Sequence, residues 1–185
     1  MSAATILRYA YLAYIAKPAE ERPLFRLIRQ RQVRSIVELG IGDGSRACRL
    51  IDLASRFAGQ PIRYSGIDLF ESRPDPATGL RYKQAHQLLK RTGAKARLVP
   101  GDPLTALSRA ANELQDTDLV IIAADQNPLA LEQAWFYMPR MLSPTGVVCQ
   151  QETLAEGQTA YRVLSAQQVG ELAGSHSRQF AAAAA

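Results

Sequence analysis

The sequence contains few of the residues that would indicate a disulfide-rich or membrane-spanning protein. It has two cysteines in 185 residues, too few for a disulfide framework. Cys48 and Cys149 both lie among apolar neighbours, so we expect core residues in a reducing compartment. The apolar N-terminal run, residues 3–16, is interrupted by Arg8, follows no basic region and is too short to span a bilayer. These absences predict a cytoplasmic protein.

The composition that remains is that of one globular domain. Apolar residues make up 47% and charged residues 21% of the chain, a balance that supports a packed core. The net charge of +5 is a mild basic excess that permits an acidic partner without requiring one. A helix predicted over 23–32 has arginines on and beside it, with no interleaved aromatic rings. That pattern favours a solvated helix face over a nucleic-acid patch.

The most informative stretch is an apolar strand followed by three closely spaced glycines. Val33, Ile36, Val37 and Leu39 form the near-continuous apolar run of a parallel strand covered on both faces. A helix with apolar residues at helical spacing begins directly after the glycines. Glycine permits positive φ and lets a ligand approach the backbone. Such a turn holds a nucleotide-like or charged ligand above the end of the strand.

The spacing of the glycines separates two classes of ligand. A dinucleotide fingerprint requires G-x-G-x-x-G, whereas here the third glycine comes one residue early and Ser45 stands at the last glycine position. Glu38 precedes the turn, and a carboxylate there suits an ammonium better than a pyrophosphate. The run Glu38-Leu39-Gly40-Ile41-Gly42-Asp43-Gly44 resembles motif I of the class I S-adenosylmethionine-dependent methyltransferases. A degenerate dinucleotide site and a glycine turn without a ligand are the alternatives.

Two further acids stand at the ends of predicted strands. Asp68 ends a strand predicted over 62–68, where a carboxylate can accept two hydrogen bonds from a ribose diol. A methyltransferase and a dehydrogenase would both place an acid here. The alternative is that Asp68 is a helix cap or a turn residue. Asp102 and Pro103 are the N-cap and first residue of a helix, and in the family an acid at this place meets the adenine amino group. The resemblance implies S-adenosyl-L-methionine as cofactor, bound by Glu38, Gly40, Ile41, Gly42, Gly44, Asp68, Leu69, Gly101, Asp102 and Pro103.

Asp125 follows the most clearly buried strand, predicted over 118–124 beside the first strand. Methyl transfer is an in-line displacement at a sulfonium carbon, so Asp125 could act as the catalytic residue that aligns the acceptor or takes its proton. A cofactor contact or a strand-end acid is the alternative. The acid pair of metal-dependent O-methyltransferases is replaced by Gln150-Gln151-Glu152, so we expect no metal. Asn127-Pro128-Leu129-Ala130 lacks the N-P-P-aromatic signature of enzymes that methylate base amines.

Strands alternating with helices predict an α/β fold, a doubly wound, mainly parallel Rossmann-like sheet with helices on both faces. Beyond Glu152 the pattern weakens. Residues 161–164 read as a further strand and 166–173 as a short helix ended by Gly174, but two antiparallel C-terminal strands are not evident, so truncation there stays open. Residues 1–32 are predicted to be N-terminal helices that serve as a cap, a lid or a dimer contact, and 33–180 the S-adenosylmethionine-binding domain.

The sequence therefore predicts a methyltransferase, a transferase of the class EC 2.1.1.-, acting on a small molecule at oxygen. An RNA-directed methyltransferase that uses residues 22–34 as a phosphate track is one alternative. A non-catalytic, methyltransferase-like binding module is another. We expect no membrane partner, and a homodimer is left open.

Overall fold

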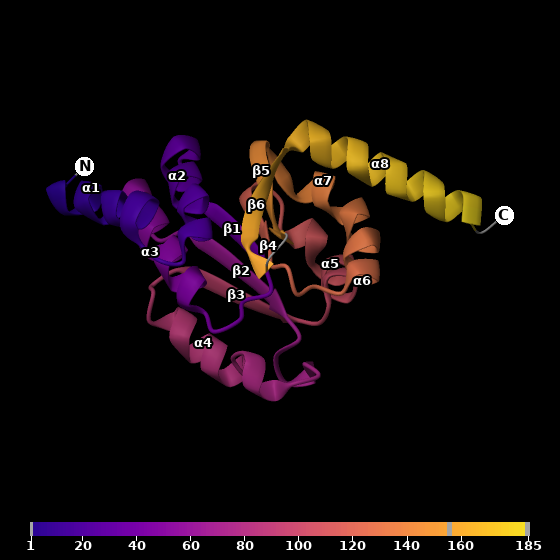
Figure 1. Ribbon diagram of the computed structural model, residues 1–185, viewed down its shortest axis with the longest axis horizontal. Coiled ribbons are helices and arrows are strands. Elements are labelled where there is room, and N and C mark those ends of the chain that lie inside the picture. Colours follow the sequence, from indigo (N-terminus) through magenta and orange to yellow (C-terminus); the bar gives the residue numbers. More distant parts are fainter. Residues whose placement is uncertain (1, 155–156, 184–185) are drawn as a thin grey trace.

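The computed structural model describes residues 2–154 and 157–183, and its centre is a six-stranded sheet with the order β3-β2-β1-β4-β5-β6 (Figure 1). Strands β1 to β5 are parallel to their neighbours, and β6 pairs antiparallel with β5. The strands are β1 (Ser35–Leu39), β2 (Arg63–Asp68), β3 (Lys95–Pro100), β4 (Thr117–Ile122), β5 (Leu142–Thr153) and β6 (Thr159–Ser165). This order reverses between β1 and β4, where open α/β sheets bind their ligands.

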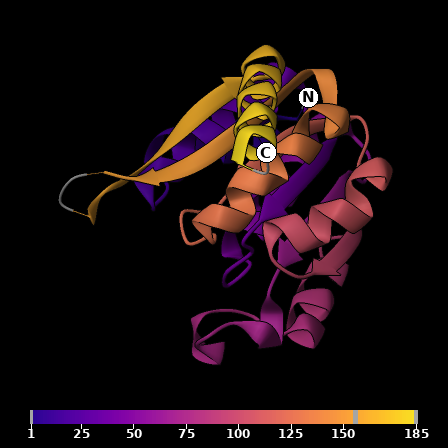
Figure 2. The same ribbon diagram turned by 90° about the vertical axis from the view of Figure 1, so that its right-hand side faces the viewer.

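Helices cover both faces of the sheet (Figure 2). One layer contains α1 (Ala3–Ala10), its π-helical continuation (Tyr11–Ile15), α2 (Arg22–Arg31), α3 (Ser45–Ala58) and α4 (Tyr82–Lys90). The other contains α5 (Pro103–Ala110), α6 (Pro128–Ala134), α7 (Met138–Met141) and α8 (Ala166–Ala183). Successive strand residues alternate between the two cores: Ile36 packs with the first layer and Val37 with the second. The predicted doubly wound fold is confirmed.

The C-terminal part differs from the sequence prediction. The uncertain segment near residue 161 is a seven-residue strand, β6, paired with β5 from Ser165 opposite Val147 to Thr159 opposite Thr153. The pattern concealed it because Leu164 is its one fully buried residue, while Val163 is half exposed. The prediction that Gly174 ends the last helix is wrong. Gly174 does not adopt the positive φ of a helix-ending glycine, and α8 continues past it.

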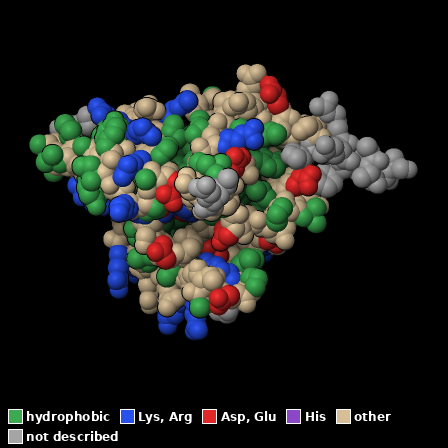
Figure 3. Space-filling view, in the orientation of Figure 1, with side chains coloured by type: hydrophobic (Ala, Val, Ile, Leu, Met, Phe, Trp, Pro, Cys, Tyr) green, Lys and Arg blue, Asp and Glu red, His purple; other side chains and the backbone are tan. Residues whose placement is uncertain are grey.

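The N-terminal helices pack on α3 as part of the first layer. Tyr9 and Leu12 are buried there, and Arg8 forms an ion pair with Asp52 of α3 at 3.0 Å. The opposite side of this segment exposes apolar side chains, which gather at the left end of Figure 3. They are Ile6, Leu7, Tyr11, Tyr14 and Ile15. The role of residues 1–32 as a lid or dimer contact stays a prediction.

Among the residues that the structure describes, every helix is too short or too polar to cross a lipid bilayer.

Candidate functional site

The glycine turn lies at the carboxyl ends of the central strands and is fastened by Asp68. Gly40, Gly42 and Gly44 all have positive φ, of +86°, +61° and +75°. The Asp68 Oδ2 atom accepts hydrogen bonds from the backbone N–H of Ile41 at 2.8 Å and of Gly42 at 3.4 Å. Only glycine adopts all three conformations without strain. The glycine spacing predicted a tight turn at this place, and the structure has one.

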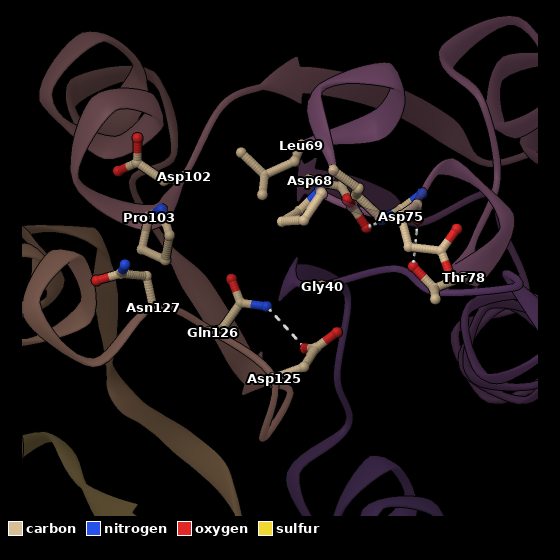
Figure 4. A pocket seen from close by; sticks show the side chains of 12 residues that line it. Gly40, Asp68, Leu69, Asp75, Thr78, Asp102, Pro103, Asp125, Gln126 and Asn127 are labelled. Carbon is tan, nitrogen blue, oxygen red and sulfur yellow. Dashed lines mark hydrogen bonds and ion pairs between the residues drawn. The ribbon is translucent and has the colours of Figure 1, made fainter.

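A cavity of about 360 Å³, the first hollow, opens over the ends of these strands (Figure 4). The side chains of Asp68 and Leu69 lie on one side of it, and Asp125 and Gln126 lie near Gly40. A Cβ atom at Gly40 would lie 2.7 Å from the Ala123 Cβ atom, which cannot rotate away, so this position has room for glycine alone. The predicted site residues that line the first hollow are Gly40, Asp68, Leu69, Asp102, Pro103 and Asp125.

The acid at the end of β3 caps a helix, as its sequence context predicted. Asp102 Oδ1 accepts from the Thr105 N–H at 3.0 Å, and Oδ2 accepts from the Thr105 hydroxyl at 2.7 Å. Partial burial acts to raise the pKa of Asp102, but these hydrogen bonds outweigh it and hold the pKa below its ordinary value. Asp102 is therefore a carboxylate at neutral pH, at the rim of the first hollow.

A second hollow of about 400 Å³ contains other residues of the glycine turn. Ile41 and Gly42 line it, together with Pro18 and Glu21 of the N-terminal segment. Its other lining residues are Asp43, Ser45, Arg46, Arg49, Ala123, Ala124, Asp125 and Gln151. Asp125 lines both hollows, so the residue that we predicted as catalytic lies where the two cavities meet.

Glu38 lies beneath the turn and lines neither hollow. Its carboxylate is fully buried, and it accepts hydrogen bonds from Tyr64 Oη and from Arg46 Nε, each at 2.6 Å. Arg46 also donates to the Gly40 carbonyl at 2.8 Å and to Tyr161 Oη of β6 at 2.9 Å. Burial and the Glu38 charge raise the pKa of Tyr64 well above its ordinary value, and burial raises that of Tyr161 to about 12. Both phenols are therefore neutral: Tyr64 donates its hydrogen bond to Glu38, and Tyr161 accepts one from Arg46.

Two predicted glycines support the site from outside the hollows. At Gly44 a Cβ atom would lie 2.5 Å from Leu88 Cδ2, so this glycine allows α4 to pack against the turn. The N–H of Gly101 donates to the Asp68 carbonyl at 2.9 Å and continues the pairing of β2 with β3. Neither residue lines a cavity described above.

Three solved methyltransferase or cofactor-bound structures resemble the chain. Precorrin-6y C5,15-methyltransferase from Geobacter metallireducens has a TM-score of 0.52 and 17% identity over 88% of this chain and 73% of its own. Cofactor-bound Rv0187 from MTB has a TM-score of 0.50 and 26% identity over 80% and 63%. The O-methyltransferase TomG from Streptomyces achromogenes, solved with SAM, has a TM-score of 0.51 and 18% identity over 82% and 66%. The chain has the class I S-adenosylmethionine-dependent methyltransferase fold.

The likeness is one of structure and not of close sequence. No protein-family model and no curated protein sequence matches the chain. The chain spans less than two thirds of the length of Rv0187 and of TomG.

Several residues of this methyltransferase fold were not predicted to line the site. Gln126 and Asn127 line the first hollow, and Asn127 caps α6 by accepting from the Ala130 N–H at 3.0 Å. The Asn-Pro pair repeats the Asp-Pro pair at the start of α5, a signal that could have identified this cap. Arg73, Asp75 and Thr78 come from the loop after β2, whose path no periodicity predicts. Within the described part of the chain, no three His, Cys, Asp or Glu side chains gather as metal ligands would.

Proposed function

We propose that the protein transfers a methyl group from S-adenosyl-L-methionine to a small-molecule acceptor. One observation supports this most directly. The motif I turn, with all three glycines at positive φ, opens onto a hollow that also contains Asp68, Leu69 and Asp102. An acid, an apolar residue and a second acid are the groups that a ribose diol, an adenine face and an adenine amino group require.

The residues present fit this cofactor. Asp68 stands at the end of β2 for the ribose, Leu69 offers an apolar side chain to the base, and Asp102 remains ionised to accept from an exocyclic amine. Gly40 brings its backbone to the first hollow, and Gly42 faces the second. When bound, the cofactor supplies an electrophilic methyl group on a sulfonium. Glu38 does not face the hollows, so its proposed contribution is to hold Arg46 against the Gly40 carbonyl.

We assign the second hollow to the acceptor and Asp125 to its alignment. Asp125 is exposed, lines both cavities and has one hydrogen bond described, from Gln126 Nε2 at 3.0 Å, which leaves carboxylate lone pairs available. A carboxylate there can orient a hydroxyl and accept its proton, which supports transfer to oxygen. Among the described residues that line the second hollow, none has an aromatic ring on which a nucleobase would stack.

The arginines at the N-terminus give little support to an RNA-directed enzyme. Arg22 donates to the carbonyls of Ile15 and Ala16, and Arg31 to that of Thr145. Arg29 lies 4.8 Å from the centre of the Tyr9 ring. These guanidinium groups hold the N-terminal helices in place, and binding an RNA phosphate would compete with the contacts that they make within the protein.

The test is a calorimetric titration of the protein with S-adenosylmethionine, S-adenosylhomocysteine and NAD. We expect binding of the first two and none of NAD. Asp68→Asn should weaken S-adenosylhomocysteine binding about tenfold or more, because an amide lacks the charge that strengthens ribose hydrogen bonds. Asp116→Asn is the matched control, since Asp116 is exposed at the opposite end of β4.

Binding of NAD alone would contradict the proposal, and so would normal affinity in a folded Asp68→Asn variant. Cofactor binding without transfer to any acceptor in a screen for S-adenosylhomocysteine release would instead indicate a non-catalytic binding module.

A further inference from the structure

Arg73, on the loop after β2, lies against the acid that we assign to the ribose. It lines the first hollow, and its side chain is only 10% exposed. Its Nη1 donates to the Leu80 carbonyl at 2.9 Å, and its Nη2 lies 2.6 Å from Asp68 Oδ2. Nη2 is buried, and no described atom accepts a hydrogen bond from it with good alignment. The contact with Asp68 is therefore a close charge pair of poor hydrogen-bond geometry.

Gly79 provides the space that the guanidinium occupies. A Cβ atom at this position would lie 2.5 Å from Arg73 Cζ and 2.6 Å from its Nη1. The φ of Gly79 is −176°, an extended conformation open to any residue. The backbone would accept any residue here, and it is the present position of the Arg73 guanidinium that depends on glycine.

The hydrogen-bonding capacity of Asp68 is nearly filled. A carboxylate has about four acceptor sites. Oδ1 accepts from the Phe70 N–H at 3.1 Å, while Oδ2 faces the Ile41 and Gly42 N–H groups as well as Arg73. One site on Oδ1 stays open, whereas Oδ2 has none to spare. A ribose diol that spans both oxygens must therefore replace a donor on Oδ2.

Arg73 is the donor that can leave. The Ile41 and Gly42 N–H groups belong to the glycine turn and are fixed by it, whereas Arg73 is a long side chain with poor alignment. We propose that Arg73 occupies the place at Asp68 where a ribose hydroxyl binds, and so determines how strongly the first hollow discriminates between ribose and deoxyribose. This inference rests on the proposed function, because it assumes that the hollow binds a nucleoside.

The exchange makes a quantitative difference. In the wild-type protein a ribose hydroxyl gains a hydrogen bond to Asp68 but must displace the Arg73 guanidinium, so its net contribution to affinity is small. Without the guanidinium the same hydroxyl meets an available carboxylate oxygen. A hydrogen bond to a charged group then corresponds to about a tenfold change in affinity or more.

The experiment measures dissociation constants for adenosine, 2′-deoxyadenosine and 3′-deoxyadenosine by displacement of S-adenosylhomocysteine, in wild type and in Arg73→Met. We expect the ratio of deoxyadenosine to adenosine constants to rise about tenfold in the variant for at least one of the two analogues. Gly79→Ala should raise the same ratio, because the new Cβ pushes the guanidinium away. Gly170→Ala, on α8 with open space around it, is the matched control and should leave the ratio unchanged.

The ratio of the deoxyadenosine and adenosine dissociation constants distinguishes competition for the ribose site from a purely structural role of Arg73 in the loop after β2. If Arg73 merely stabilises the loop, all three ligands weaken by the same factor and the ratio stays constant, which would overturn the proposal. A ratio that falls in Arg73→Met would show that the arginine assists ribose binding, with the same consequence. If the folded wild-type protein binds neither adenosine nor S-adenosylhomocysteine, the proposed function itself fails. Gly79→Ala retains the test if Arg73→Met does not fold.

Discussion

Replacing Arg46 by methionine should destabilise the protein strongly, because Arg46 is the only described cation paired with the buried Glu38 carboxylate. The guanidinium side chain is 13% exposed and the carboxylate side chain 0%. Methionine retains the apolar part of the side chain but leaves Glu38 with the Tyr64 hydroxyl as its one remaining described donor. Breaking a buried ion pair by removing one partner costs about 3–5 kcal/mol. For a chain of this size, that corresponds to a fall in Tm of about 6–20 °C.

The assay is equilibrium unfolding in urea, followed by far-UV circular dichroism, with Tyr161→Phe as the matched control. Tyr161→Phe removes one hydrogen bond that the same guanidinium donates to a neutral phenol and should cost about 1.5–3 kcal/mol. In the double variant Glu38→Gln with Arg46→Met the buried charge is gone, so the loss should be smaller than in Arg46→Met alone. A loss for Arg46→Met no greater than that for Tyr161→Phe would refute this account of the ion pair.

Two further variants test the turn and the helix cap. Gly40→Ala should abolish S-adenosylhomocysteine binding in calorimetry, because its Cβ would lie within 2.7 Å of Ala123 Cβ as well as close to Gln126. Gly42→Ala has open space among the described residues and should cost only about 1–2 kcal/mol of backbone strain, with binding retained; equal effects of the two alanines would contradict the steric argument. The lowered pKa of Asp102 stabilises the native state above the ordinary carboxyl pKa, and this stability is lost as the pH falls through the lowered value. Thermal unfolding should therefore show Asp102→Asn less stable than wild type at pH 7, with the difference shrinking in acid. A difference in stability that stays constant across pH would contradict a contribution from the Asp102 charge.

Local patterns were enough to predict the central strands and the turn. The apolar runs of β1 and β4 are short, buried on both faces and bounded by polar or glycine residues, so their type and position were readable. Asp102 was readable as a cap because its partner, Thr105, lies three residues away. Interactions of this kind depend on sequence spacing, and the sequence contains that directly.

The partners of the two key acids were not readable in the same way. Glu38 reads as a carboxylate for an ammonium, yet its two oxygens are taken by Arg46 and by Tyr64, which comes from the neighbouring strand. Arg73 meets Asp68 only because the loop after β2 folds back over Gly79. Such pairs depend on strand register and loop path, and neither has a periodic signal in the sequence.

The walls of the second hollow show the same limit. Glu21 of the N-terminal segment forms an ion pair with Arg49 of α3 at 2.7 Å. Beside it, Glu20 accepts a hydrogen bond at 3.1 Å from the Thr159 hydroxyl of β6. The N-terminal segment thus contributes Pro18 and Glu21 to the region that we assign to the acceptor, and it contacts β6 beside that region. Composition at either end indicated helices or a weak strand, but not that the two would meet.

The position of β1 between β2 and β4 has a consequence for how the chain reaches its native state. β2 follows β1 after a single helix, whereas β4 arrives much later: the backbone of Ser35 is hydrogen-bonded to Asp118, 83 positions along the chain. Until that segment has been synthesised and docked, one edge of this central strand has no partner. An open edge of this kind pairs readily with other chains, so the strand order that creates the ligand crevice also leaves an edge exposed to aggregation until β4 has docked.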